Sequence, residues 1–163
     1  MHSLSSAGEI RLRDPLESDV PVFFEHQRDD EALRMSASAA KDLDAFAAHW
    51  AKTSADAAVL KKTILVGGAV AGFVASFERL GKKEVCYWLG RGFWGRGIAT
   101  QGLLAFLPLV KERPLFARVA KRNWGSIRVL EKCGFKKIGE DKYRNALGEE
   151  VGEFLMQLDA GQS

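Results

Sequence analysis

Apolar residues alternate with charged ones in one short stretch near the N-terminus and then recur at helical spacing. Residues 10–13 alternate in the way that is typical of a half-buried strand. Ser18 or Asp19 is placed to cap a first helix, whose first turn holds Pro21. Apolar positions three and four residues apart predict a second helix at about residues 42–52.

The pattern then changes to strands. Residues 59–66 and 69–77 read as two strands, because the pair of glycines between them is a two-residue hairpin signal. A second turn at residues 80–83 leads into a third strand at residues 84–89. We therefore expect three consecutive antiparallel strands in the middle of the chain.

The second half returns to helices alternating with strands. The predicted elements are a helix that ends at Leu107 before a proline, a strand at 115–120, a helix capped by Asn123 that runs through Cys133, and hairpin strands at 135–144 and 151–158. The order β-α-α-β-β-β-α-β-α-β-β predicts an α+β fold. We expect a mixed central sheet of about seven strands, with about four helices on both faces.

Length and composition predict one soluble domain. The chain of 163 residues has 47% hydrophobic and 28% charged residues, as ordinary globular proteins do. We expect a single domain over residues 1–163 with loose ends at about 1–8 and 159–163. No apolar run is long enough to span a bilayer, and no signal peptide is recognisable, so we expect a cytoplasmic protein without a membrane partner.

Two cysteines, Cys86 and Cys133, form neither a disulfide framework nor a zinc pattern, and we expect each to be a small buried side chain. The three histidines, His2, His26 and His49, have no metal-ligand spacing, so no metal is expected. They also have no evident nucleophile partner, which leaves Ser-His or Cys-His catalysis unsupported.

Positive charge is concentrated in one part of the chain. Residues 91–137 hold eleven basic residues against two acidic ones, although the net charge of the whole chain is only +3. A basic segment can hold a polyanion, such as a nucleic acid or a nucleotide-bearing cofactor, or can simply be a solvated face. Because aromatic residues are not interleaved with the basic ones, we expect no nucleic-acid partner.

A glycine-rich stretch at residues 89–100 joins a predicted strand to a predicted helix. Glycine lets a ligand approach the backbone closely, and the unpaired amides at a helix start favour phosphate. A P-loop is excluded, because Ile98 and Ala99 replace its Lys and Ser or Thr. The spacing of Gly90, Gly92 and Gly95 matches a dinucleotide fingerprint only weakly, because no acidic residue follows at the required distance.

Two motifs resemble those of the GNAT superfamily, the acyl-CoA-dependent N-acyltransferases. Residues 94–99 are similar to its pyrophosphate loop, Q/R-x-x-G-x-G/A, with Trp94 departing at the first position. Residues 121–135 resemble its N-x-x-S-x-x-x-L-E-K-x-G-F segment, and the predicted element order is that of the GNAT fold. Residues 84–89 resemble the matching strand of the branch that acetylates ribosomal-protein N-termini, which also holds enzymes acting on small amines.

The resemblance implies acetyl transfer from acetyl-CoA to an amine in a ternary complex. The loop amides would bind the pyrophosphate, and the strand end would pair with the pantetheine arm. The Leu89 amide would hold the thioester oxygen, and Ser126 would contact the donor or protonate the departing thiolate. Arg128 and Lys132 are expected near the nucleotide end. The donor-binding residues implied are Trp88, Leu89, Gly90, Trp94, Gly95, Arg96, Gly97, Ile98, Ala99, Thr100, Asn123, Ser126 and Lys132.

The acceptor must be a neutral amine when it attacks. Reaching that form at pH 7 costs a lysine side chain about 4.6 kcal/mol but an α-amine only about 1.4 kcal/mol. The chain offers one modest base, Glu84. At the position where many GNAT enzymes carry a tyrosine that acts as general acid, this chain has Glu131. We therefore expect a peptide N-terminus as acceptor, acted on by a monomer or homodimer. A small polyamine-like or antibiotic-like amine, and a non-catalytic acyl-CoA-binding module, remain alternatives.

Overall fold

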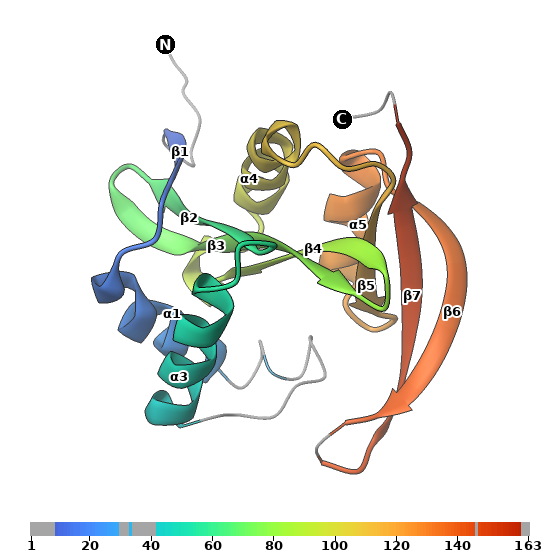
Figure 1. The fold of residues 1–163 in the computed structure, drawn as a ribbon, viewed down its shortest axis with the longest axis horizontal. Coiled ribbons are helices and arrows are strands. Elements are labelled where there is room, and N and C mark those ends of the chain that lie inside the picture. The colour runs from blue at the N-terminus through green and yellow to red at the C-terminus, as the bar shows by residue number, and fades with distance from the viewer. Residues whose placement is uncertain (1–8, 30–32, 34–41, 146, 161–163) are drawn as a thin grey trace.

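The computed structural model describes residues 9–29, 33, 42–145 and 147–160 (Figure 1). Of the loose ends expected at about 1–8 and 159–163, residues 1–8 and 161–163 lie outside these ranges. The helices are α1 (Val20–Gln27), α3 (Leu43–Ser54), α4 (Ile98–Phe106) and α5 (Trp124–Lys132), with short 3-10 turns η1 (Glu17–Asp19), η2 (Arg91–Phe93) and η3 (Leu107–Leu109). The strands are β1 (Ile10–Arg13), β2 (Leu60–Val66), β3 (Ala69–Arg79), β4 (Lys82–Leu89), β5 (Leu115–Ala120), β6 (Lys136–Arg144) and β7 (Glu150–Leu158).

The strands form one seven-stranded sheet in the order β1-β2-β3-β4-β5-β7-β6. Every neighbouring pair is antiparallel except β4 and β5, which are parallel. The predicted α+β fold with a mixed sheet is therefore confirmed, as is the order of its elements.

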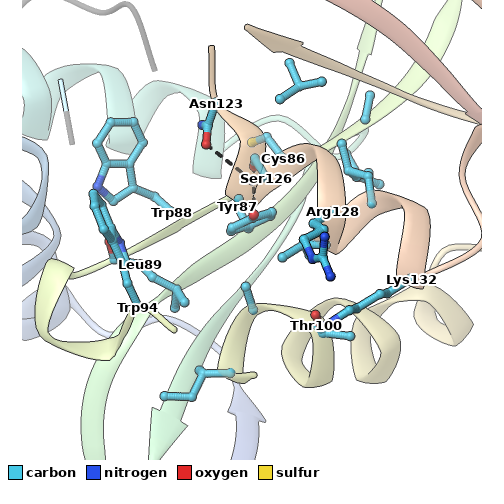
Figure 2. A pocket seen from close by; sticks show the side chains of 18 of the residues that line it. Cys86, Tyr87, Trp88, Leu89, Trp94, Thr100, Asn123, Ser126, Arg128 and Lys132 are labelled. Carbon is cyan, nitrogen blue, oxygen red and sulfur yellow. Dashed lines mark hydrogen bonds between the residues drawn. The ribbon is translucent and has the colours of Figure 1, made fainter. Parts of the chain in front are cut away.

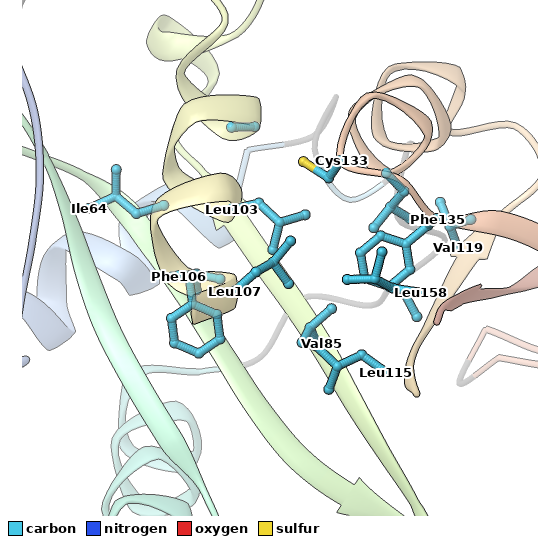
Figure 3. Close-up of a cluster of buried hydrophobic side chains, with 14 of the residues drawn as sticks. Ile64, Val85, Leu103, Phe106, Leu107, Leu115, Val119, Cys133, Phe135 and Leu158 are labelled. Atoms are coloured by element: carbon cyan, nitrogen blue, oxygen red, sulfur yellow. The ribbon is translucent and has the colours of Figure 1, made fainter. Parts of the chain in front are cut away.

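Helices cover both faces of the sheet, as expected (Figure 1). On one face, α1 and α3 pack aromatic side chains against β3. The ring centres of Phe23 and Trp50 are 5.0 Å apart. On the other face, α4 and α5 bury a larger aliphatic core against the middle strands (Figure 3). Phe106 and Leu107 at the end of α4 and Leu158 of β7 are completely buried there. Each face thus has its own core, and the sheet between them is held on both sides.

Local signals fix most of the boundaries. Gly67 and Gly68 both take positive φ between β2 and β3, as the hairpin prediction requires. The α4 helix ends at Phe106, next to the predicted Leu107, because Pro108 cannot continue it. Asn123 caps α5 as predicted, since its side-chain oxygen accepts from the amide of Ser126 at 3.2 Å.

The predicted side-chain cap of α1 is wrong. Asp19 stands at the N-cap but makes no cap hydrogen bond, because its carboxylate is buried and points toward β1 and β2. It accepts from the Arg13 guanidinium at 2.7 and 2.9 Å and from the Thr63 hydroxyl at 2.7 Å. Burial alone would raise the pKa of Asp19, but these donors outweigh it and lower that pKa. Asp19 therefore fastens the start of α1 to the sheet.

The parallel pair at the centre of the sheet opens almost at once. β4 and β5 are in register at one pair only, Glu84 with Phe116, whereas β3 and β4 stay in register over eight pairs, down to Gly72 and Leu89. Beyond Glu84, β4 continues along β3 while β5 follows β7. The C-terminal part of β4 therefore has an edge that none of the described strands covers.

Candidate active site

A cavity of about 700 Å³ lies where β4 and β5 separate (Figure 2). Both strands, the loop after β4 and the first turns of α4 and α5 contribute to its wall. Of the residues predicted to bind the donor or catalyse transfer, those that line it are Trp88, Leu89, Trp94, Gly95, Gly97, Ile98, Ala99, Thr100, Asn123, Ser126 and Lys132. Gly90, Arg96 and Glu84 do not line it.

The glycine loop leaves an open cradle at the start of α4. Gly95 and Gly97 take φ of 73° and 75°, which L side chains rarely adopt, and a Cβ at Gly95 would meet no atom within 4 Å. Gly97 is the N-cap of α4, and no side chain caps the helix there. The first amides of a nine-residue helix thus lack a side-chain acceptor at the cavity wall, where the helix dipole favours an anion. This arrangement fits a pyrophosphate.

Two basic side chains of α5 face the same end of the cavity. Arg128 and Lys132 are one helical turn apart, and Figure 2 shows them pointing toward Thr100 in the first turn of α4. They add positive charge close to the α4 amides. This end of the cavity therefore suits the phosphates of a nucleotide-bearing ligand.

Trp94, which departs from the phosphate-loop pattern, is tied to the strand before the loop. Its indole Nε1 donates to the main-chain oxygen of Leu89 at 3.1 Å. The hydrogen bond spans the loop from its middle back to the last residue of β4. The tryptophan therefore braces the strand end, a contact that the sequence did not indicate.

The amide of Leu89 faces the cavity. The amide of Gly90 donates to the Ala71 carbonyl on β3 at 2.9 Å. Because hydrogen-bonding directions alternate along an antiparallel strand, the Leu89 amide points to the opposite edge. That edge is the one that β5 leaves uncovered, so the amide is oriented toward a ligand in the cavity.

Two hydroxyl groups meet across the cavity from different elements. The Tyr87 hydroxyl on β4 and the Ser126 hydroxyl in the first turn of α5 are 2.7 Å apart, and either can be the donor (Figure 2). Burial raises the pKa of Tyr87 to about 12, against a smaller lowering by the Ser126 hydrogen bond. Both groups are therefore protonated at neutral pH. Sequence reasoning missed Tyr87, although strand alternation placed it on the same face as Val85 and Leu89.

The model of an acetyltransferase (GNAT) domain family matches residues 9–136. The chain belongs to the GNAT acetyltransferase family. It is an acyl-CoA-dependent N-acetyltransferase, and its acyl donor is acetyl-CoA.

Solved structures share the fold of this acetyltransferase. Spermidine N-acetyltransferase from Vibrio cholerae, in complex with CoA and spermine, superposes with a TM-score of 0.80 at 16% identity, over 94% of this chain and 96% of that chain. The aminoglycoside acetyltransferase AAC(6')-Ib, in complex with coenzyme A, gives 0.76 at 18% identity, over 93% and 95%. No curated protein matches the acetyltransferase by sequence. The assignment to the ribosomal-protein branch stays a prediction.

Glu84, the predicted base of the acetyltransferase, lies in a buried ion pair. Its carboxylate accepts from the Arg118 guanidinium at 3.3 Å, and Arg118 also donates to Glu153 at 3.0 Å. Glu84 is five positions before Leu89, which corresponds to roughly 16 Å along a strand. Its role as the base stays a prediction, but its carboxylate is engaged by Arg118 and the distance separates it from the strand end.

The expectation of a buried cysteine is confirmed for Cys133 and wrong for Cys86. Cys86 points into the cavity, because the neighbouring strand turns away just there. Although Cys86 is exposed to the cavity, the protein atoms around it keep water away from the thiol, and this desolvation, followed by the charge of Glu84, raises the pKa of Cys86 to about 11. The thiol is therefore protonated at neutral pH and is a weak nucleophile.

Two other features are absent from the described ranges. None of the helices there is long and apolar enough to cross a membrane. The same part of the chain holds no group of three or more His, Cys, Asp or Glu side chains that could bind a metal ion.

Proposed function

We propose that this acetyltransferase transfers the acetyl group of acetyl-CoA to a primary α-amine at a peptide or protein N-terminus, by direct attack in a ternary complex. One observation carries the proposal: the uncovered edge of β4, where the Leu89 amide faces the cavity between an anion cradle and the Tyr87–Ser126 pair. The branch resemblance of residues 84–89 supports the choice of an α-amine.

Each wall of the cavity has a part in holding the donor. The amides from Gly95 to Thr100 hold the pyrophosphate, with Arg128 and Lys132 adding charge. Asn123 uses its side-chain oxygen to cap α5, which leaves its amide group to donate to the pantetheine arm. The main-chain edge near Trp88 and Leu89 supplies further hydrogen bonds.

The chemistry places negative charge at two points of the cavity. As the amine nitrogen bonds to the carbonyl carbon, negative charge collects on the carbonyl oxygen, and the Leu89 amide stabilises it by a hydrogen bond. When the carbon–sulfur bond breaks, the thiolate takes a proton from Ser126, which takes one from Tyr87 along their 2.7 Å hydrogen bond, and Tyr87 regains its proton from water after the products leave. The protein around the cavity raises the pKa of the Cys86 thiol to about 11, so a thiolate beside it binds a proton readily.

The α-amine is the first choice because it needs little help to lose its proton. About one α-amine in ten is already neutral at pH 7, whereas a lysine side chain is neutral about once in 2,500. A weak base or a water relay is therefore sufficient for an N-terminal acceptor.

A small amine with several positive charges is the second candidate. Three carboxylates, from Glu84, Glu153 and Asp141, lie within 4.0 Å of the single Arg118 guanidinium beside the cavity, so negative charge is in excess there. Long-range attraction of a cation to such a site weakens as salt is added. The similar structures with spermine or an aminoglycoside bound are consistent with this second candidate.

Thiol release from acetyl-CoA tests the proposal. The amines are a hexapeptide with a free N-terminal serine, its N-acetylated form carrying one lysine, spermine, and kanamycin, each at low and high ionic strength. We expect the free N-terminus to be acetylated fastest. Faster acetylation of the lysine peptide would contradict an α-amine acceptor, and turnover of spermine or kanamycin alone would favour the second candidate. No thiol release with any amine would contradict the proposed function.

A further inference from the structure

His26, on α1, lies directly against the last turn of the central strand. A Cβ built on Gly90 would fall 2.6 Å from both Cδ2 and Nε2 of the imidazole, a separation that real atoms do not reach. Only glycine at position 90 therefore lets the ring occupy this place. The ring also meets Phe93 of η2 edge to face, with the ring centres 6.4 Å apart. The imidazole is thus held next to Gly90, one residue beyond Leu89.

The imidazole has no polar partner that explains why it is there. Its Nδ1 is buried without a hydrogen bond to any described residue. Burial lowers the pKa of His26, and no charged group contributes to that change. The charged residues close to His26 in the sequence, and Arg91 next to Gly90, form ion pairs with one another. Glu25 pairs with Arg28 at 3.1 Å, and Arg91 of η2 pairs with Asp29 at 3.3 Å. The ring is therefore neutral at pH 7, with a lone pair available to take up a proton.

We infer that His26 is the proton acceptor for the attacking amine, an inference that rests on the function proposed above. The Cδ2–Nε2 side of the ring lies with its face against Gly90, so Nε2 is next to the backbone there, and with the ring hydrogen on Nδ1 this nitrogen carries the lone pair. The Leu89 amide, which stabilises the carbonyl oxygen, belongs to the preceding residue, so the amine reacts close to this nitrogen. As the nitrogen–carbon bond forms, the amine proton moves to Nε2, and the imidazolium later releases it to water.

His26 suits this step better than Glu84 does. Glu84 lies at the other end of β4 with its carboxylate engaged by Arg118 at 3.3 Å, whereas the histidine lies at the end where the loop begins. A histidine with a lowered pKa is also fully in its basic form at neutral pH. On sequence grounds His26 had neither metal-ligand spacing nor a nucleophile partner, and nothing in the sequence indicated that α1 packs against Gly90.

The test compares kcat for His26→Gln with that of wild type from pH 5 to 8. The acceptor is the hexapeptide with a free N-terminus, or spermine if spermine is the only amine that the wild type acetylates. His49→Gln is the matched control, because His49 is exposed on α3. We expect His26→Gln to lower kcat at pH 7 on the order of 100-fold. Wild-type kcat should also fall as the pH drops through the lowered pKa of His26, and this fall should be absent from the variant.

A second variant separates proton transfer from packing. His26→Ala removes the ring beside Gly90, and added imidazole should restore part of the activity only if the ring acts as a base. The acetyl-CoA dissociation constant should stay within about threefold of wild type in both variants, which packing damage at Gly90 would not allow. Unchanged kcat in His26→Gln, or no rescue of His26→Ala, would overturn the role of His26 alone. Absence of wild-type turnover would instead contradict the proposed function.

Discussion

Trp94 and Leu89 are joined by a hydrogen bond of 3.1 Å from the indole Nε1 to the main-chain oxygen. The bond closes the loop onto the end of β4, where the Leu89 amide faces the cavity. Trp94 thus links the two parts of the donor site, which are the glycine loop before α4 and the open edge of β4. Several expected outcomes depend on this relationship.

Trp94→Phe removes the indole donor and keeps an aromatic ring in the loop. We expect the free energy of unfolding to fall by about 1 kcal/mol, the usual net worth of one hydrogen bond. The acetyl-CoA dissociation constant, measured by calorimetry, should rise by about fivefold for the same reason. Trp124→Phe is the control, because Trp124 is 78% exposed and does not line the cavity. Equal effects of the two substitutions would contradict the bracing role.

Gly97→Asp places a carboxylate where the pyrophosphate binds, and aspartate tolerates the positive φ of this position better than most residues. We expect acetyl-CoA binding to be lost while the domain still folds. Wild type should gain about 2.7 kcal/mol of stability at 100 times its dissociation constant, and the variant none. Gly148→Asp is a matched control, since its φ of 79° is close to the 75° of Gly97 but its hairpin is away from the cavity. Normal acetyl-CoA affinity in folded Gly97→Asp would show that the loop has no donor role.

Tyr87→Phe and Ser126→Ala each interrupt the hydroxyl pair, whose oxygens are 2.7 Å apart. We expect kcat to fall roughly 10- to 100-fold in each single variant. Because the two groups act in one relay, the double variant should be little worse than either single one. Steady-state kinetics at saturating acetyl-CoA measures this. Fully multiplicative losses would mean that the hydroxyls act separately.

Stability at high pH should report on Tyr87. Its folded-state pKa of about 12 lies above the ordinary value of 10, so its contribution is fully present below pH 10 and is lost as the pH rises toward 12. The loss amounts to about 2 kcal/mol, since one pKa unit is worth about 1.4 kcal/mol and the side chain is only half-buried. Denaturant unfolding of wild type and Tyr87→Phe at pH 8 and pH 11 should show a shallower decline in the variant. The raised thiol pKa values of Cys86 and Cys133 act in both proteins and cancel. Parallel declines would contradict a raised pKa for Tyr87.

The elements of this fold could be predicted because their signals are local. The glycine pair of the β2–β3 turn, the proline after α4 and the Asn123 cap each act within a few residues. The two GNAT motifs likewise lie in short continuous segments, so the residues around the cavity could be named from the sequence. The side-chain direction of Asp19 could not, because β1 and Thr63 of β2 compete with the local cap.

The relations across the site depend on tertiary register, which no local pattern encodes. Tyr87 and Ser126 are 39 positions apart and meet only because β4 and α5 face the same cavity. Glu84 pairs with Arg118 because β4 and β5 are parallel and in register at Glu84 alone. The exposure of Cys86 follows from the separation of the same two strands.

The central claim is that the donor lies along the open edge of β4 with its phosphates at the start of α4. Backbone amide NMR of the ¹⁵N-labelled protein during titration with coenzyme A tests it most directly. We predict the largest shifts at the amides of Leu89, Gly95 to Thr100 and Ser126, with smaller changes along α3 and β6. Saturating coenzyme A that leaves the Leu89 and Gly97 amides unmoved, or that shifts a different surface, would contradict the account.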